Sequence, residues 1–254
     1  MFEDLSGKVA VVTGGARGLG FSIARVLAQH GVHVGLLDLL PDVEASARRL
    51  ADLGVATHGG VTDVTDPAAV DDAFDEVTAA LGVPQILVTA AGITIWDDSV
   101  TVEPATWRKV LAVNLDGTFF ACQSFARRLL AEDSTGSALL ISSMSAAIVN
   151  RPQNQASYNA SKAAVSHLAS SLAVEWAGDG MRVNAIAPGY FLSDMTRQFI
   201  EANPELADAW TAAIPMQRMG EPEDLHGLAL YLASDASAYL TGQTIVIDGG
   251  YTAV

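Results

Sequence analysis

The sequence predicts an α/β fold in which one parallel seven-stranded sheet carries helices on both faces. Short apolar runs rich in β-branched residues alternate with longer amphipathic runs along the 254 residues. Strands that alternate with helices imply right-handed crossovers and a parallel sheet that is covered on both faces. No linker, low-complexity block or internal repeat interrupts the alternation, so we expect residues 1–254 to form a single doubly wound domain.

Each strand is expected where a short apolar run is bounded by turn residues. In order, these runs are Val9–Thr13, Val32–Leu37, Val55–Gly60, Ile86–Thr89, Ala138–Ser142, Met181–Ala187 and Thr244–Ile247. The helices are expected in the longer runs between them, which are Gly18–His30, Pro41–Leu53, Pro67–Leu81, Pro104–Ala131, Ala156–Ala177 and Pro222–Ala233. The third of these begins as helices typically do, because Asp66 can cap the N-terminus and Pro67 fits the first turn.

The longest irregular stretch is Pro188–Pro215, which contains Pro204 and a helix-like piece at Asp194–Ala202. An insertion of this length in a compact domain is usually functional, and we expect a substrate lid at about 188–215. Its apolar side chains would suit an apolar ketone, or would simply pack the lid against the body: Tyr190, Phe191, Leu192, Met195 and Phe199.

The composition restricts partners and compartment. A net charge of −15 repels nucleic-acid phosphates and anionic lipid headgroups. The one cysteine, Cys122, cannot form a disulfide within the chain, and no Cys/His cluster has the spacing of a metal site. The first residues do not resemble a signal peptide, and no apolar stretch approaches the ~20 residues that span a bilayer. We expect a cytoplasmic protein without a metal, a nucleic-acid partner or a membrane.

A glycine-rich turn, TGGARGLG, runs from Thr13 to Gly20 between the first strand and the first helix. Glycine at positions 14, 18 and 20 allows a tight turn, close approach of the backbone to a pyrophosphate and close packing of helix on strand. The helix N-terminus then offers free N–H groups and a partial positive charge to phosphates. The pattern predicts a dinucleotide site of Rossmann type, whereas the alternative is a glycine-rich turn without a ligand. The expected contacts are Gly14, Arg17, Gly18, Leu19 and Gly20.

Asp38 ends the second strand, 18 residues after Gly20. A carboxylate there can accept hydrogen bonds from both ribose hydroxyls and would repel a 2′-phosphate, which favours NAD over NADP. Alternatively, Asp38 only caps the next turn. Arg17 could attract a 2′-phosphate, or it faces solvent. Asp63 and Val64 follow the third strand, where an adenine ring would lie, although an aspartate before a turn is often only a cap.

Tyr158 and Lys162 lie four residues apart on an expected helix and therefore share one face. A neighbouring ammonium lowers the pKa of a phenol from its usual value near ~10, so that the pair can exchange a proton with an alcohol or a ketone. The alternative is an ordinary exposed Tyr–Lys pair. Ser143 follows a buried strand at the edge of the sheet where such folds bind ligands. Asn114 lies inside an apolar helix, either anchoring a water of a proton relay or satisfied by backbone groups.

Together these residues resemble the short-chain dehydrogenase/reductase family, over almost the whole chain from Gly7 to Gly250. The resemblance implies a catalytic tetrad of Asn114, Ser143, Tyr158 and Lys162. In it Tyr158 is the acid/base, Lys162 also binds the nicotinamide ribose and Ser143 orients the substrate. Asn114 would support the water relay. Further cofactor contacts are implied at Ala90, Gly92, Pro188, Gly189 and Ser193.

Two features depart from the family pattern. Thr89-Ala90-Ala91-Gly92 stands where Asn-Asn-Ala-Gly is usual, and we expect backbone contacts to the cofactor to survive the change. The catalytic serine is also ambiguous, because Ser143 lies 15 residues before Tyr158 whereas Ser145 lies at the more usual interval of 13. We favour Ser143, which sits at the end of the strand.

The segment from Ser143 to Gln153 is similar to a subgroup of the family that oxidises sugar alcohols, the polyol dehydrogenases. Ser145 and Asn150 could bind hydroxyls of a polyol, with Tyr190 of the lid nearby, or they are ordinary loop polarity. Alternatives within the fold are gluconate 5-dehydrogenase and 3-oxoacyl-carrier-protein reductase activities. The second usually prefers NADP and needs a basic docking surface, which Asp38 and the net charge disfavour. A non-catalytic dinucleotide-binding regulator is disfavoured by the intact Tyr158 and Lys162.

We expect a homotetramer with twofold axes, because two long helices carry small or apolar residues on more than one side. The family resemblance implies the same assembly. The residues that indicate it are Ala160, Ala164, Leu168, Ser171 and Leu172 in one helix and Val110, Val113, Phe120 and Phe125 in the other.

Overall fold

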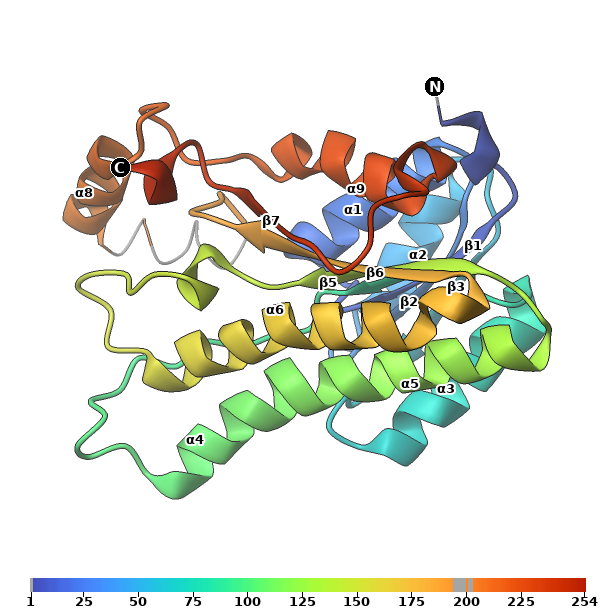
Figure 1. Ribbon diagram of the computed structural model, residues 1–254, viewed down its shortest axis with the longest axis horizontal. Coiled ribbons are helices and arrows are strands. Elements are labelled where there is room, and N and C mark those ends of the chain that lie inside the picture. Colours follow the sequence, from blue (N-terminus) through green and yellow to red (C-terminus); the bar gives the residue numbers. More distant parts are fainter. Residues whose placement is uncertain (1, 194–199, 201–202) are drawn as a thin grey trace.

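The seven strands form one parallel sheet in the computed structural model, which describes residues 2–193, 200 and 203–254. Their order across the sheet is β3-β2-β1-β4-β5-β6-β7 (Figure 1). The bounds are β1 Val9–Thr13, β2 His33–Asp38, β3 Thr57–Val61, β4 Ile86–Thr89, β5 Gly136–Ile141, β6 Met181–Pro188 and β7 Thr244–Ile247. The predicted fold class is confirmed. The chain reverses its direction of travel across the sheet between β1 and β4, where doubly wound folds open a crevice at the carboxyl ends of the strands.

Helices cover both faces of the sheet (Figure 1). One face carries α1 (Gly18–Gln29), α2 (Val43–Ala51) and α9 (His226–Ala233). The other carries α3 (Pro67–Leu81), α4 (Pro104–Leu111), α5 (Gly117–Ala131) and α6 (Ala156–Trp176). Within the described residues, no helix is both long and apolar enough to cross a membrane.

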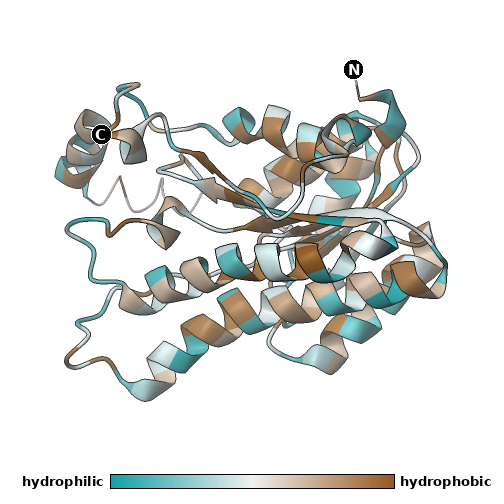
Figure 2. Cartoon of the chain, in the orientation of Figure 1, coloured by the Kyte–Doolittle hydropathy of each residue, from teal (hydrophilic) through white to brown (hydrophobic). Residues whose placement is uncertain are grey.

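Alternate side chains of each strand enter opposite cores. Val12 and Leu36 pack with α1, α2 and α9, whereas their neighbours Val11 and Leu37 pack with the helices of the other face. This follows from the twofold repeat of a strand, and it explains why buried parallel strands are continuous apolar runs. In Figure 2, largely brown, apolar strands lie between helices whose ribbons mix brown and teal.

The helix expected at Pro104–Ala131 is interrupted, which corrects the sequence-based prediction. α4 ends at Leu111, Ala112–Asp116 form a π-helical turn, and α5 begins at Gly117, whose N–H donates to the carbonyl of Ala112. Such wide turns commonly mark functional sites. The only buried residue of the turn is Asn114, and its hydrogen bonds reach outside the helix, so tertiary contacts rather than helix propensity set the local geometry.

The stretch predicted as a lid contains a helix that the sequence reading missed, α8 (Pro204–Ala213). Pro204 was interpreted as part of an irregular stretch, but it occupies the first turn, where proline is well tolerated. Trp210 of α8 is buried beside Ile214 and Met219 in a small third core. The helix-like piece expected at Asp194–Ala202 lies, apart from residue 200, outside the described residues, as do Met195 and Phe199.

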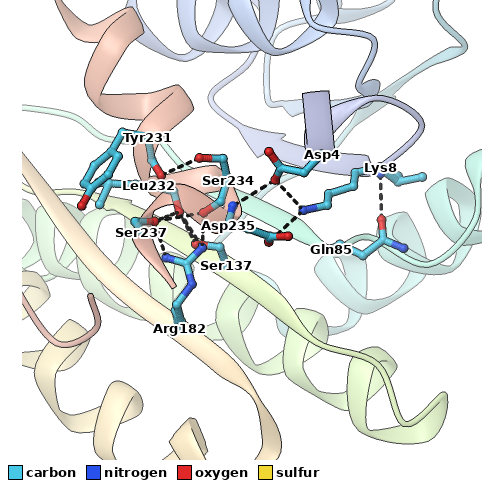
Figure 3. A network of polar contacts seen from close by, with 11 residues as sticks. Asp4, Lys8, Gln85, Ser137, Arg182, Tyr231, Leu232, Ser234, Asp235 and Ser237 are labelled. Carbon is cyan, nitrogen blue, oxygen red and sulfur yellow. Dashed lines mark hydrogen bonds and ion pairs between the residues drawn. The ribbon is translucent and has the colours of Figure 1, made fainter. Parts of the chain in front are cut away.

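The amino ends of the strands are tied together by a polar network (Figure 3). Arg182, at the start of β6, donates to the hydroxyl of Ser237 at 2.8 Å and to the carbonyl of Leu232 at 2.9 Å. Asp4 accepts from the backbone N–H of Asp235 at 2.9 Å. These contacts hold the segment after α9 against the sheet. The carboxyl ends, at the other edge, carry the residues predicted to bind cofactor and substrate.

Candidate active site

The glycines of the first turn have different physical roles. A Cβ on Gly14 would lie 2.5 Å from the Ala91 nitrogen, and one on Gly20 would lie 2.3 Å from the Gly14 oxygen, so both are needed for packing. Gly18 has a φ of +61°, and among the described residues an added Cβ would meet Ser193 alone, at 4.0 Å. Within the described part of the chain, Gly18 therefore has room beside it at the N-terminus of α1, opposite Ser193. The N–H groups of a first helical turn favour a phosphate group, so this position suits the predicted pyrophosphate.

Asp38 is fixed by two backbone groups. Its carboxylate accepts from the N–H of Ala16 in the glycine turn and from the N–H of Leu40, each at 3.0 Å. It thus caps the turn after β2 and also holds the glycine turn in place. Carboxylate oxygens have further lone pairs that ribose hydroxyls could use. Arg17 is exposed.

Asp63 and Val64 occupy the turn after β3. Asp63 accepts from the N–H and the hydroxyl of Thr65, at 2.9 and 2.8 Å, which is the capping role left open by the sequence. Val64 is buried against Gly117, where a Cβ would approach the valine side chain to 2.7 Å. The π turn before Gly117 therefore lies close to the predicted adenine position.

The loop after β4 is held without the usual asparagines. The N–H of Ala90 donates to the Thr13 carbonyl at 3.0 Å, and that of Ala91 reaches the Thr13 hydroxyl at 3.4 Å. At Gly92 a Cβ would lie 3.4 Å from Asn114 Oδ1 and 3.5 Å from Lys162 Nζ. Gly92 thus lies where the π turn and α6 meet.

Tyr158 and Lys162 project from the first two turns of α6. Lys162 is buried, its Nζ donates to the carbonyl of Ile141 at 2.7 Å, and burial lowers the pKa of the ammonium to about 8. Burial raises the pKa of Tyr158, and a hydrogen bond with the Ser143 hydroxyl acts in the opposite direction. The direction is opposite to that expected from the sequence, because the desolvation of the phenol outweighs the stabilisation of its charged form.

Asn114 joins the loop after β4 to the catalytic helix. Its Oδ1 accepts from the N–H of Ile93 at 2.8 Å, and its Nδ2 donates to the Ile93 carbonyl at 3.0 Å and to the Ser161 hydroxyl at 2.9 Å. Ser161 in turn donates to the carbonyl of Tyr158 at 2.7 Å. The side chain of Asn114 is thus hydrogen-bonded to protein groups, in line with the alternative that backbone groups satisfy it. Ser161 was overlooked although it lies inside the Tyr-x-x-x-Lys segment.

The two candidate serines have different partners. Ser143 is the hydroxyl hydrogen-bonded with Tyr158, and it also accepts from the N–H of Ser145 at 3.1 Å. The Ser145 hydroxyl donates to Asn150 Oδ1 at 2.5 Å. Asn150 then donates to the Tyr190 hydroxyl at 3.1 Å. Ser145, Asn150 and Tyr190 are therefore brought together as one polar chain beside Ser143.

A cavity of about 220 Å³ adjoins Ser143 and Tyr158. Its lid side is aromatic: Tyr190 and Trp210 stack with ring centres 4.5 Å apart, and Trp96 meets Trp210 edge-on at 6.5 Å. The lining is completed by Thr94, Met144, Ser145, Asn150, Gln153, Gln155 and Gly189. Gly189 follows Pro188 at the end of β6, where a Cβ would lie 2.6 Å from the Asp248 Cβ. The sequence reading missed Thr94, Trp96, Met144, Gln153, Gln155 and Trp210 here. The sequence signal that could have pointed to the cavity wall is the amide-rich run just before Tyr158.

An open parallel sheet with this glycine turn, and a Tyr–Lys pair beside a cavity at its carboxyl edge, defines a nucleotide-dependent oxidoreductase. A family model described as Enoyl-(Acyl carrier protein) reductase matches residues 14–252. The chain belongs to the short-chain dehydrogenase/reductase family, which confirms the resemblance seen in the sequence.

Relatives with assigned activities match over nearly their whole length. Galactitol 2-dehydrogenase (L-tagatose-forming) of Cereibacter sphaeroides is 45% identical over 98% of this chain and 96% of that protein. D-arabinitol 2-dehydrogenase (ribulose-forming) of Scheffersomyces stipitis is 39% identical over 97% and 94%. Among solved structures, a gluconate 5-dehydrogenase from Burkholderia cenocepacia in complex with NADP and tartrate superposes with a TM-score of 0.93 at 34% identity, covering 100% of this chain and 99% of that one.

Proposed function

We propose that this oxidoreductase interconverts a sugar alcohol and the corresponding ketose. The carrying observation is the cavity beside Tyr158 and Ser143, which combines a wall of polar side chains, the Gln153 amide among them, with an aromatic wall. Amides hydrogen-bond hydroxyls, whereas aromatic faces contact the C–H groups of a polyol chain. The galactitol and arabinitol dehydrogenases among the relatives support this substrate class.

The proposed chemistry places each predicted residue in a role. The phenolic oxygen of Tyr158 takes the proton of the substrate hydroxyl during oxidation and returns it during reduction. The Ser143 hydroxyl, hydrogen-bonded with that phenol, holds the substrate oxygen. Lys162 stabilises the phenolate through its charge and binds the ribose. Asn114, through Ser161, fixes the start of α6. A bound nicotinamide supplies the hydride acceptor or donor.

We propose NAD as the cofactor. Asp38 puts a carboxylate at the end of β2, and the next residues, Leu39 and Leu40, bring no positive charge that would hold a 2′-phosphate. Against this, the gluconate 5-dehydrogenase neighbour was solved with NADP, and Arg17 is exposed near the turn. The carboxylate weighs more, because it would lie closest to an added phosphate and repel it.

We further propose that the chain works as a single domain with its lid at 188–215. The stack of the half-buried Tyr190 on the buried Trp210 ties this stretch to the cavity, since both side chains line it. The one cysteine, buried and free, suits the reducing cytoplasm.

One assay tests the proposal. Purified protein is incubated with NAD or NADP and a panel containing galactitol, D-arabinitol, sorbitol, gluconate and 2-hexanol, and the absorbance of the reduced cofactor is followed. We expect the highest kcat/KM with a polyol and NAD. A higher kcat/KM for gluconate than for every polyol would overturn the substrate class, and no reduction with any member would overturn the enzymatic role under these conditions.

A further inference from the structure

Gln153 combines a place in the cavity wall with an unsatisfied polar atom. Its side chain is only 6% exposed and lines the cavity. The Nε2 group donates to the Tyr190 hydroxyl at 3.0 Å, but Oε1 is buried without a hydrogen-bond partner among the described residues. Buried polar atoms are nearly always paired, because an unpaired one loses its hydration without compensation. An orphan acceptor in a substrate cavity therefore points to a ligand group.

The inference holds for either orientation of the amide. If the group were turned by half a rotation, its oxygen would accept from Tyr190 and its NH₂ would be left without a partner. A hydroxyl both donates and accepts, so it satisfies whichever atom of the amide is left without a partner.

The neighbouring glutamine has protein partners at both ends of its amide. Gln155 lines the same cavity, yet its Nε2 donates to Asn159 at 3.1 Å and its Oε1 accepts from Thr94 at 3.4 Å. Ser145 and Asn150, which the sequence favoured for substrate binding, already hydrogen-bond each other. Among the described residues that line the cavity, Gln153 is thus the amide that keeps an atom without a protein partner.

We propose that the amide of Gln153 binds a substrate hydroxyl other than the one that is oxidised, and so selects polyhydroxylated substrates over simple secondary alcohols. The reacting hydroxyl is held at Tyr158 and Ser143, so Gln153 contacts a different position of the carbon chain. This inference rests on the proposed function. Tyr190 orients the amide, and its stack on Trp210 links recognition of the hydroxyl to the lid.

The test compares Gln153→Leu with wild type on a polyol and on 2-hexanol, which has one hydroxyl. We expect kcat/KM for the polyol to fall about tenfold or more, because a substrate hydroxyl is left without its partner, and kcat/KM for 2-hexanol to change less than about threefold. A similar loss on both substrates, or a loss under threefold on the polyol, would overturn the proposal.

Two control variants separate recognition from structure. Tyr190→Phe removes the hydroxyl that orients the Gln153 amide but keeps the ring and the amide, so it should cause a smaller selective loss than Gln153→Leu. If it reproduces that loss in full, Gln153 acts only by holding Tyr190, and the proposal is wrong. Gln155→Leu removes an amide with protein partners at both ends, and it should not change the ratio of the two kcat/KM values; a change as large as that of Gln153→Leu contradicts the assignment. Titration with cofactor, followed by fluorescence, checks that each variant is folded.

A measurement on the wild type alone completes the design. Deoxy analogues of the preferred polyol, each lacking one hydroxyl beyond the oxidised carbon, should include one whose kcat/KM is about tenfold lower. If every analogue matches the parent, no such hydroxyl is bound, and the inference falls even if no variant folds. Absence of polyol oxidation by the wild type would instead refute the proposed function itself.

Discussion

The Nζ atom of Lys162 lies 5.8 Å from the centre of the Tyr158 ring and donates its hydrogen bond to the Ile141 carbonyl at the end of β5. The ammonium is therefore anchored to the sheet, one helical turn from the phenol. Both groups are desolvated, which lowers the pKa of the lysine and raises that of the tyrosine. Charges act more strongly on their neighbours in a desolvated site than in water, so a charged Lys162 would favour the phenolate form of Tyr158.

Tyr158→Phe keeps the ring but removes the ionisable oxygen. We expect turnover to fall by about 100-fold or more, because proton transfer loses its acid/base, while NAD binding persists. Steady-state kinetics and a fluorescence titration with cofactor measure the two effects. A variant that retains more than a tenth of the wild-type turnover would show that another group carries the proton.

Lys162→Met tests the cost of burying the ammonium. The folded-state pKa of Lys162, about 8, lies below the ordinary lysine value of 10.5, so folding disfavours the charged form. The penalty is present in full below pH 8 and disappears as the pH rises towards 10.5, and its upper limit is roughly 3 kcal/mol. The variant should therefore be inactive, and without cofactor it should be more stable than wild type at pH 7. The lost hydrogen bond to the Ile141 carbonyl reduces this gain in stability.

Urea unfolding at pH 7, 8 and 9 checks this prediction. The stability gap between the variant and wild type should narrow as the pH rises. A gap that widens with pH would mean that Lys162 is not held in a charge-disfavouring site.

Asp38 should decide between the two cofactors. We expect wild type to prefer NAD, and Asp38→Asn to narrow the preference by roughly tenfold or more in kcat/KM, because the charge that repels a 2′-phosphate is gone. Asp38→Ala should be worse with both cofactors, since it also releases the N–H of Ala16 in the glycine turn. A wild type that uses NADP as well as NAD contradicts the hypothesis directly.

The two serines offer a matched comparison. Ser143→Ala should lower kcat by about 100-fold, because its hydroxyl is the one at the reacting oxygen. Ser145→Ala should cost less than about tenfold, since its hydroxyl serves Asn150. The reverse ranking in parallel assays would move the substrate-orienting role to Ser145.

The fold could be predicted from the sequence because the local sequence patterns all favour it. A continuous apolar run as short as Val9–Thr13, rich in β-branched residues and bounded by turn residues, favours a strand buried on both faces. Glycines at the turn from a strand into a helix favour a nucleotide site. The π turn at Asn114 was out of reach, since it depends on Ile93 and Ser161, both distant in sequence. Gln153 could not be singled out either, because its missing partner is visible only once the cavity is assembled.

Some of the residues from which we predicted a homotetramer do not bear on assembly, although we still propose a homotetramer. Leu172, Val110 and Phe125 are buried within the protomer, so they give no information about an interface. Ala160 and Ser171 are exposed, and Ala164, Leu168, Val113 and Phe120 are half-buried. Other large apolar side chains are exposed on the same helices and beside them, namely Trp107, Phe119, Leu130 and Val174.

The edge strand β7 offers a second surface for a partner. Among the described residues, no strand pairs with its outer side, Val246 is 41% exposed, and Tyr239, five residues before β7, is fully exposed. Exposed edges and apolar helix faces are commonly covered by self-association, and two surfaces paired across twofold axes close into a tetramer. Light scattering at micromolar concentration should give about four times the 26.5 kDa of one chain. Val174→Glu together with Phe119→Glu should reduce that mass to a dimer if the α5–α6 face is one interface. A wild-type mass near that of one chain would refute the tetramer, and an unchanged tetramer in the double variant would exclude this face.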